Sequence, residues 1–247
     1  MEDNFSWENT ESKYDNNIKQ SLPIFYDYYD LSKDFINVYE PAEDTFLLID
    51  SITFDISSEK NKNKFINPIK SIELGCGNGL ISICFLDILK KENIKLKNHY
   101  CIDINKYALN LTEKLIKNYN LNDNVYFIES DLFSSFEKED KFDIIIFNPP
   151  YVTTDEEEYK RALEKKDIYA SWAGGKKGCE TIFKFIDQLK YHINENSIIY
   201  LLLSKENEYL KIIKQIKKDI NFDFEILMKR KASNERLAVF KFFKSTE

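Results

Sequence analysis

The alternation of short apolar runs with longer amphipathic stretches constrains the fold of this 247-residue chain more than any other feature. Such alternation is typical of βαβ units, in which helices connect neighbouring parallel strands. The run Phe142–Phe147 (FDIIIF) is almost entirely apolar, as expected for a central strand that helices cover on both faces. The last two runs are close enough along the chain to pair antiparallel. We therefore predict an α/β fold with a seven-stranded, mainly parallel sheet, an antiparallel C-terminal strand pair and helices on both faces, the strands being Ser71–Leu74, Tyr100–Asp103, Val125–Glu129, Phe142–Phe147, Ser197–Leu203, Phe224–Lys229 and Leu237–Phe243.

Composition and charge exclude several classes of protein and of site. The net charge of −7 disfavours a broad phosphate-binding face, because an acidic protein gains little from counterion release on nucleic acid. Only two histidines are present and the four cysteines form no C-x-x-C pair, so we expect no metal site. No apolar run approaches the roughly 18 to 20 residues that a membrane-spanning helix needs. We expect a soluble protein without membrane contact, located in the cytoplasm, with the nucleus left open as a second location.

The six glycines fall in two clusters, and each cluster is a candidate site. The first, in Glu73–Gly79 (ELGCGNG), follows the first predicted strand, where open α/β sheets bind their ligands. The spacing is G-x-G-x-G and not the G-x-G-x-x-G of dinucleotide sites, so pyrophosphate binding is disfavoured. The acidic side chain of Glu73 instead suits a ligand that carries an ammonium group.

Two aspartates follow the next two predicted strands. Asp103 ends the second strand, where a carboxylate can accept both hydroxyls of a ribose. Asp131 follows the third strand, where it could accept from the exocyclic amine of adenine while the Leu132 N–H reaches a ring nitrogen. A helix cap is the alternative for each aspartate taken alone. Three acidic residues at three consecutive strand ends around a glycine turn favour a nucleoside-type ligand.

The fourth predicted strand ends in Asn148–Tyr151 (NPPY). Prolines remove backbone donors and fix φ, so this turn presents carbonyl acceptors beside the Asn148 side-chain oxygen. Such a site holds an NH₂ group, and holding both hydrogens of a planar amide steers its nitrogen lone pair toward an electrophile. The face of Tyr151 can pack on the planar group or stabilise a nearby cation. A methyl sulfonium is the matching electrophile, and it requires no strong general base before attack.

The second glycine cluster, in Ser171–Gly178 (SWAGGKKG), admits two interpretations. It is either a flexible, peptide-contacting loop with Trp172 as its anchor or a purely structural loop. The charged run Asp155–Asp167 is typical of a solvated helix face or loop.

These motifs together resemble the class I S-adenosylmethionine-dependent methyltransferases, and within them the HemK family of protein glutamine N5-methyltransferases in its short eukaryotic and archaeal form. NPPY is shared with nucleic-acid amino methyltransferases, whereas the first and last matching segments are specific to this subgroup. The resemblance implies a Rossmann-like methyltransferase domain over residues 38–247. The polar composition of the segment before it predicts a partly disordered extension over residues 1–37. The matching segments are Val38–Phe46 (VYEPAEDTF), Glu73–Gly79, Asp103–Asn105, Asp131–Leu132, Asn148–Val152 and Trp172–Gly175.

The resemblance also implies roles for individual residues. The cofactor would be S-adenosylmethionine, and the substrate the glutamine of a Gly-Gly-Gln motif in a peptide chain release factor. A small zinc-binding activator subunit would complete the enzyme as a heterodimer, docking at the sheet edge formed by Val125–Glu129. The cofactor would be bound by Thr45, Glu73, Gly75, Gly77, Asp103, Asp131, Leu132 and Asn148. The substrate would be bound by Asn148, Pro149, Pro150, Tyr151 and Trp172, of which Asn148, Pro149 and Tyr151 are the predicted catalytic residues.

Other functions stay open at this point. The same acceptors could hold the amine of a protein lysine, and NPPY also occurs in methyltransferases of RNA or DNA bases. The acidic net charge argues against nucleic acid, although Lys211, Lys214, Lys217 and Lys218 give one helix a basic face. A non-catalytic stabilising subunit is the third reading, and the intact Asn148 turn argues against it, because a scaffold gains nothing from unpaired buried acceptors.

Overall fold

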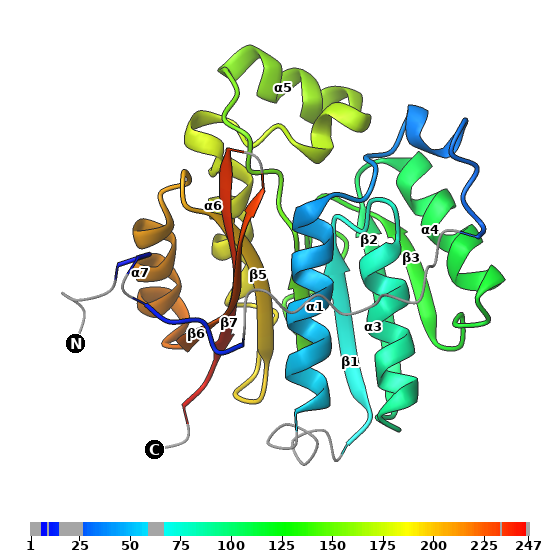
Figure 1. Ribbon diagram of the computed structural model, residues 1–247, viewed down its shortest axis with the longest axis horizontal. Coiled ribbons are helices and arrows are strands. Elements are labelled where there is room, and N and C mark those ends of the chain that lie inside the picture. Colours follow the sequence, from blue (N-terminus) through cyan, green and yellow to red (C-terminus); the bar gives the residue numbers. More distant parts are fainter. Residues whose placement is uncertain (1–5, 9, 15–26, 59–66, 233, 246–247) are drawn as a thin grey trace.

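A seven-stranded sheet in the order β3-β2-β1-β4-β5-β7-β6 forms the centre of the molecule (Figure 1). The computed structural model describes residues 6–8, 10–14, 27–58, 67–232 and 234–245. The first five strands pair in parallel, and β7 pairs antiparallel with both β5 and β6. The predicted sheet and its antiparallel C-terminal pair are confirmed, with strands β1 (Ile69–Leu74), β2 (Leu96–Asp103), β3 (Val125–Glu129), β4 (Ile144–Phe147), β5 (Ile198–Ser204), β6 (Asp223–Ala232) and β7 (Glu235–Phe243).

Helices cover both faces of this sheet. In β4, Ile144 and Ile146 belong to one buried cluster and Ile145 and Phe147 to the other, as the alternation of side chains along a strand requires. Helices α1, α3 and α4 supply the first cluster, and α6 and α7 supply the second. None of the helices in the described part of the chain is long and apolar enough to cross a membrane. The helices are α1 (Glu43–Ser57), α3 (Leu80–Lys91), α4 (Lys106–Asn118), α5 (Glu156–Lys165), α6 (Glu180–Leu189) and α7 (Tyr209–Ile220), with short 3₁₀ turns η1 (Asp34–Ile36), η2 (Ile168–Ser171) and η3 (Lys176–Gly178).

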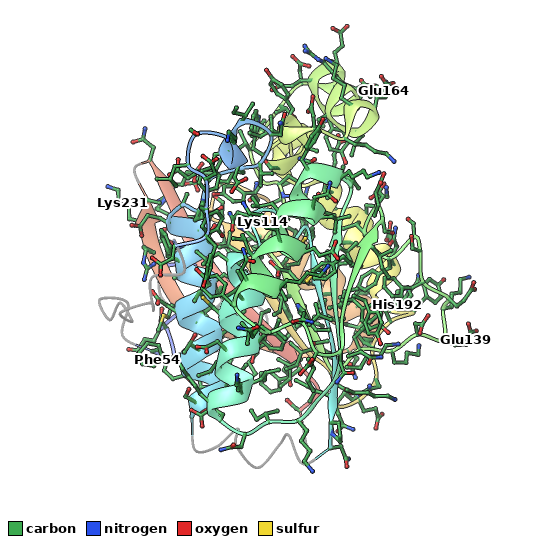
Figure 2. The ribbon with its side chains drawn as sticks, turned by 90° about the vertical axis from the view of Figure 1, so that its right-hand side faces the viewer. Phe54, Lys114, Glu139, Glu164, His192 and Lys231 are labelled. Atoms are coloured by element: carbon green, nitrogen blue, oxygen red, sulfur yellow. The ribbon has the colours of Figure 1, made fainter. Side chains whose placement is uncertain are left out.

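Helix α5 lies apart from these two layers, beyond the carboxyl ends of the strands (Figure 1). Its start is defined by Asp155, whose side chain accepts from the Glu158 N–H at 2.8 Å and caps the first turn. Figure 2 shows Glu164 at that end of the molecule, and its side chain is exposed. The charged run predicted as a solvated face or loop is therefore a helix, placed above the end of the sheet at which ligands bind.

Part of the N-terminal extension packs against the domain. The Trp7 ring is buried and lies 5.1 Å from the Tyr209 ring, and the Lys13 N–H donates to the Ile226 carbonyl of β6 at 2.8 Å. The Lys13 ammonium lies 2.7 Å from the buried Asp55 carboxylate. Residues 6–8 and 10–14 belong to the extension that was expected to be partly disordered, but the Trp7 ring, backbone hydrogen bonds to β6 and ion pairs such as Lys13–Asp55 hold them against the domain. Residues 1–5, 9 and 15–26 of that extension lie outside the described residues.

Candidate active site

An open cavity lies at the carboxyl ends of the central strands, where the chain crosses from one half of the sheet to the other. This reversal of strand order is the usual ligand site of open α/β sheets. The turns after β1, β2, β3 and β4 form the floor of the cavity, the start of α1 forms one wall, and the α5–η2 segment forms the opposite wall. The predicted site residues that line this cavity are Thr45, Gly75, Gly77, Asp103, Asp131, Leu132, Asn148, Pro149 and Pro150.

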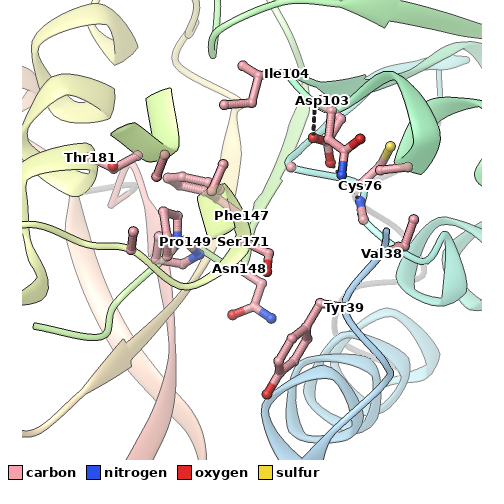
Figure 3. A pocket seen from close by; sticks show the side chains of 18 of the residues that line it. Val38, Tyr39, Cys76, Asp103, Ile104, Phe147, Asn148, Pro149, Ser171 and Thr181 are labelled. Atoms are coloured by element: carbon pink, nitrogen blue, oxygen red, sulfur yellow. Dashed lines mark hydrogen bonds between the residues drawn. The ribbon is translucent and has the colours of Figure 1, made fainter. Parts of the chain in front are cut away.

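The glycine turn and Asp103 form one end of the cavity (Figure 3). Gly75 and Gly77 have φ values of +65° and +51°, which L side chains rarely adopt. The Asp103 carboxylate accepts from the Gly77 N–H at 2.9 Å and from the Asn105 N–H at 2.8 Å, so its orientation is fixed. Burial raises the pKa of Asp103 to about 6, although these two hydrogen bonds act in the opposite direction. A fixed carboxylate facing a cavity suits a ligand that donates hydroxyl hydrogens.

Asp131 and Leu132 lie beside this end, directly after β3. Leu132 takes a φ of +53°, which turns the backbone sharply at the cavity. The Lys184 ammonium of α6 pairs with Asp131 Oδ2. This ion pair holds the carboxylate in place at the floor of the cavity, where it can accept from an exocyclic amine.

Asn148 presents an unsatisfied acceptor at the other end of the cavity. Its Nδ2 donates to the Asp44 carboxylate at 3.1 Å, which fixes the orientation of the side-chain amide. Its Oδ1 is buried and has no hydrogen-bond partner among the described residues. Pro149 and Pro150, which follow in the same turn, also line the cavity. Buried acceptors without a partner are rare in native proteins, and each one calls for a functional explanation. A planar NH₂ group is the ligand that fits here.

The sequence motifs did not point to Asp44, whose carboxylate holds the side-chain amide of Asn148. Its buried carboxylate accepts from the Thr45 N–H at 2.7 Å as well as from Asn148. Because Asp44 begins a helix instead of ending a strand, the strand-end rule could not find it. The available signal was its position next to Thr45 within the segment EPAEDT. Tyr39, just upstream, also lines the cavity and is drawn beside Asn148 in Figure 3.

Glu73 does not line the cavity, contrary to the predicted ammonium contact. Its side chain is 1% exposed and accepts a hydrogen bond from Ser82 of α3, behind the glycine turn. The same Ser82 hydroxyl lies 2.9 Å from Nε2 of the buried His99. Burial raises the pKa of Glu73 to about 8 and lowers that of His99 to about 3, so both side chains are neutral at pH 7. The cluster belongs to the interior beneath the site.

Tyr151 and Trp172 also lie outside the cavity lining. The Tyr151 hydroxyl donates to Glu235 at 3.1 Å and lies 3.4 Å from Asp44 Oδ2, the oxygen that also accepts from Asn148. The Trp172 ring packs against Tyr169, with centroids 5.1 Å apart. The expected roles of both side chains in direct substrate contact stay predictions.

The second glycine cluster braces the NPPY turn. A Cβ at Gly174 would lie 2.7 Å from the Pro150 carbonyl oxygen, and one at Gly178 would overlap the Tyr151 carbonyl oxygen. The buried Asn207 Nδ2 donates to the same Tyr151 carbonyl at 2.9 Å. Of the two interpretations left open by the sequence, the structural loop accounts for these glycines, because only residues without side chains fit so close to the turn.

The α5–η2 segment forms the wall of the cavity opposite the start of α1. Ala162 and Leu163 on α5 and Ser171 at the end of η2 contribute to the lining, and Ala162 is buried. The acidic first turn of α5 is exposed. The run between residues 155 and 171 thus contributes small, apolar and, at Asp167, acidic residues to the cavity lining and presents a charged outer face.

Comparison with known proteins agrees with this geometry. Residues 55–165 match the methyltransferase small domain family. The chain is 32% identical over 219 residues to the eRF1 methyltransferase catalytic subunit mtq2 of Schizosaccharomyces pombe, covering 86% of this chain and 91% of that protein. It is 30% identical over 213 residues to the methyltransferase HEMK2 of Homo sapiens, covering 85% and 92% of the two chains.

Solved structures show the same fold. Mtq2 of E. cuniculi, solved in complex with Trm112, matches with a TM-score of 0.57 at 24% identity, over 84% of this chain and 99% of that one. The T. thermophilus 16S rRNA methyltransferase RsmC, solved with AdoMet and guanosine, matches with a TM-score of 0.55 at 13% identity, over 84% and 44%. The length and identity of the first two sequence matches carry the assignment: this chain is a methyltransferase and belongs to the HemK family of protein N5-glutamine methyltransferases, in the short form that includes mtq2 and HEMK2.

Proposed function

We propose that this enzyme transfers a methyl group from S-adenosylmethionine to the side-chain amide nitrogen of the glutamine in a Gly-Gly-Gln motif of a peptide chain release factor. The observation that carries the proposal is the buried, unpartnered Oδ1 of Asn148 in a turn of two prolines. The names of the relatives support the substrate, since mtq2 is an eRF1 methyltransferase subunit and a protein of Aquifex aeolicus that is 31% identical over 144 residues is a release factor glutamine methyltransferase.

The residues present fit S-adenosylmethionine. The fixed Asp103 carboxylate suits the two hydroxyls of a ribose, and Asp131 suits the exocyclic amine of adenine. The positive φ values at Gly75 and Gly77 let the backbone approach a ligand without a side chain in the way. When bound, S-adenosylmethionine supplies a methyl group on a positively charged sulfur.

The acceptor side of the reaction depends on how Asn148 is held. Asp44 accepts from Nδ2 and thereby leaves Oδ1 to accept a hydrogen of the substrate amide. The carbonyl oxygens of a proline turn offer a second acceptor, because proline supplies no backbone donor. A primary amide held by both hydrogens has a fixed plane, and its nitrogen lone pair, which is perpendicular to that plane, is then aligned with a methyl donor lying over one face. The chain's contribution is orientation, and no strong base is needed before attack.

We propose in addition that a small partner subunit, of the zinc-binding kind implied by the resemblance, pairs with the edge strand β3. Within the described residues β3 pairs with β2 alone, and Tyr126 on β3 is 46% exposed. An accessible edge strand is a template for strand addition. Trm112, the partner of the E. cuniculi Mtq2 with the matching fold, is the candidate to test.

The function is tested by methyl transfer from labelled S-adenosylmethionine to a release factor, with and without the co-expressed partner. Label on the wild-type factor and none on a Gly-Gly-Glu variant is the expected result. Asn148→Ala should lose transfer while its melting temperature stays close to that of the wild type. Label that persists in the Gly-Gly-Glu variant would refute glutamine as the acceptor, and equal transfer by Asn148→Ala would refute the assigned acceptor site.

A further inference from the structure

Glu235 lies at the start of β7, next to the turn of the C-terminal hairpin and far along the chain from every motif of the site. Its Oε2 accepts the Tyr151 hydroxyl hydrogen at 3.1 Å. The hydroxyl of Tyr151 also lies 3.4 Å from Asp44 Oδ2, the oxygen to which Asn148 donates. Tyr151 thus connects the C-terminal hairpin to the Asp44–Asn148 hydrogen bond.

The hydroxyl of Tyr151 carries a single hydrogen, which two carboxylates compete to accept. Burial and the neighbouring charges of Asp44 and Glu235 raise the pKa of Tyr151, so this hydrogen is present throughout the physiological range. The Tyr151 hydroxyl lies closer to Glu235 than to Asp44, which favours donation to Glu235. No lysine or arginine among the described residues lies within ion-pair distance of Asp44 or Glu235, so the competition is decided by this hydroxyl alone.

We propose that Glu235 is a positioning residue for methyl transfer. Because the Tyr151 hydroxyl donates to Glu235, the Asp44 carboxylate remains available to accept from Asn148 Nδ2. That hydrogen bond keeps Asn148 Oδ1 turned to the cavity. Without Glu235, Asp44 Oδ2 is the remaining acceptor for the Tyr151 hydrogen, and its bond to Asn148 weakens. The amide of Asn148 is then free to rotate, and its NH₂ group can face the NH₂ group of the substrate amide, so that two donors meet and the substrate nitrogen loses its acceptor.

This inference rests on the proposed function, since it assigns a role within amide methylation. Its kinetic test is the set Glu235→Ala, Tyr151→Phe and the double variant, with Arg236→Ala as the control from the same hairpin, whose side chain pairs with Glu206 at the surface. We expect Glu235→Ala to lower kcat about tenfold, equivalent to about 1.4 kcal/mol, with the Kd for S-adenosylmethionine unchanged. In the Tyr151→Phe background, Glu235→Ala should cause no further loss of kcat. Additive losses would overturn the proposal.

A second readout needs no turnover. The side-chain NH₂ signals of Asn148, followed by ¹⁵N-resolved NMR of the wild-type enzyme, report the hydrogen bond to Asp44 directly. We expect these signals to shift in Glu235→Ala, to return most of the way in Glu235→Gln, whose side-chain oxygen can accept the same hydrogen, and to stay in place in Arg236→Ala. Unchanged signals in Glu235→Ala would overturn the positioning role even if the enzyme methylates another substrate. A wild-type enzyme without transfer to glutamine would refute the proposed function and leave this readout intact.

Discussion

Replacing Asp44 by alanine should disable methyl transfer while leaving cofactor recognition by Asp103 in place. The substitution removes the acceptor that lies 3.1 Å from Asn148 Nδ2. A hydrogen bond to a charged group contributes about 1.5 to 3 kcal/mol. If this energy is what keeps Oδ1 facing the substrate, its loss lowers kcat by a factor of roughly 10 to 150, because about 1.4 kcal/mol corresponds to tenfold in rate.

The assay for this prediction is steady-state methyl transfer at saturating cofactor, with calorimetric binding of S-adenosylmethionine alongside it. Glu43→Ala is the matched control, because Glu43 precedes Asp44 in the same helical turn and its carboxylate lies 3.5 Å from Arg230 on the hairpin side. We expect Glu43→Ala to retain kcat within about twofold. A kcat for Asp44→Ala equal to that of the wild type would refute the claim that Asp44 orients the acceptor amide.

Three further predictions follow from burial and packing. Burial raises the pKa of Asp103 to about 6, so protonation below that pH removes the charged acceptor. The affinity for S-adenosylmethionine, measured by calorimetry, should then fall by up to tenfold per pH unit. The pH dependence of this affinity should be flattened in Asp103→Asn. Glu73 has a pKa of about 8 in the folded protein against a reference of 4.5, so its ionisation costs stability as pH rises between these values; the melting temperature of Glu73→Gln should exceed that of the wild type by a margin that grows from about pH 5 to pH 8. Gly178→Ala places a Cβ on the Tyr151 carbonyl at a φ of +65° and should cost at least about 2 kcal/mol, or roughly 4 to 8 °C in melting temperature.

Each of these has a contradicting result. A cofactor affinity that is constant between about pH 5 and pH 7 would show that Asp103 does not carry the ribose contact as a carboxylate. A stability difference for Glu73→Gln that does not change with pH would mean that the buried carboxyl is not neutral. A Gly178→Ala protein with unchanged melting temperature would mean that the loop moves away from the turn at no cost.

The sheet and one half of the site followed from rules that act locally. Apolar runs and their spacing located every strand, because a parallel sheet buried on both faces leaves a continuous apolar signal. Asp103, Asp131 and Asn148 were predicted because the carboxyl ends of neighbouring parallel strands meet at one edge. The structure brings all three to one cavity.

The other half of the site depends on the direction of individual side chains and on contacts between segments that are far apart in the sequence. Glu73 is in the correct segment, but its side chain points beneath helix α3 to Ser82, and a sequence motif carries no information on which side of the turn a carboxylate lies. Asp44 and Glu235 reach Asn148 and Tyr151 from 104 and 84 residues away along the chain. Such contacts leave no local periodicity, so they could be found only in the folded chain.

The most direct test of the account is to locate the methyl group in the product by tandem mass spectrometry. The wild-type enzyme, its partner subunit and a release factor are incubated with S-adenosylmethionine, and the peptide that contains Gly-Gly-Gln is sequenced. We expect a single methyl on the glutamine side chain with the wild-type enzyme and none with Asn148→Ala. A methyl on a lysine of the factor, or a Gly-Gly-Gln peptide left unmodified while RNA becomes methylated, would contradict it.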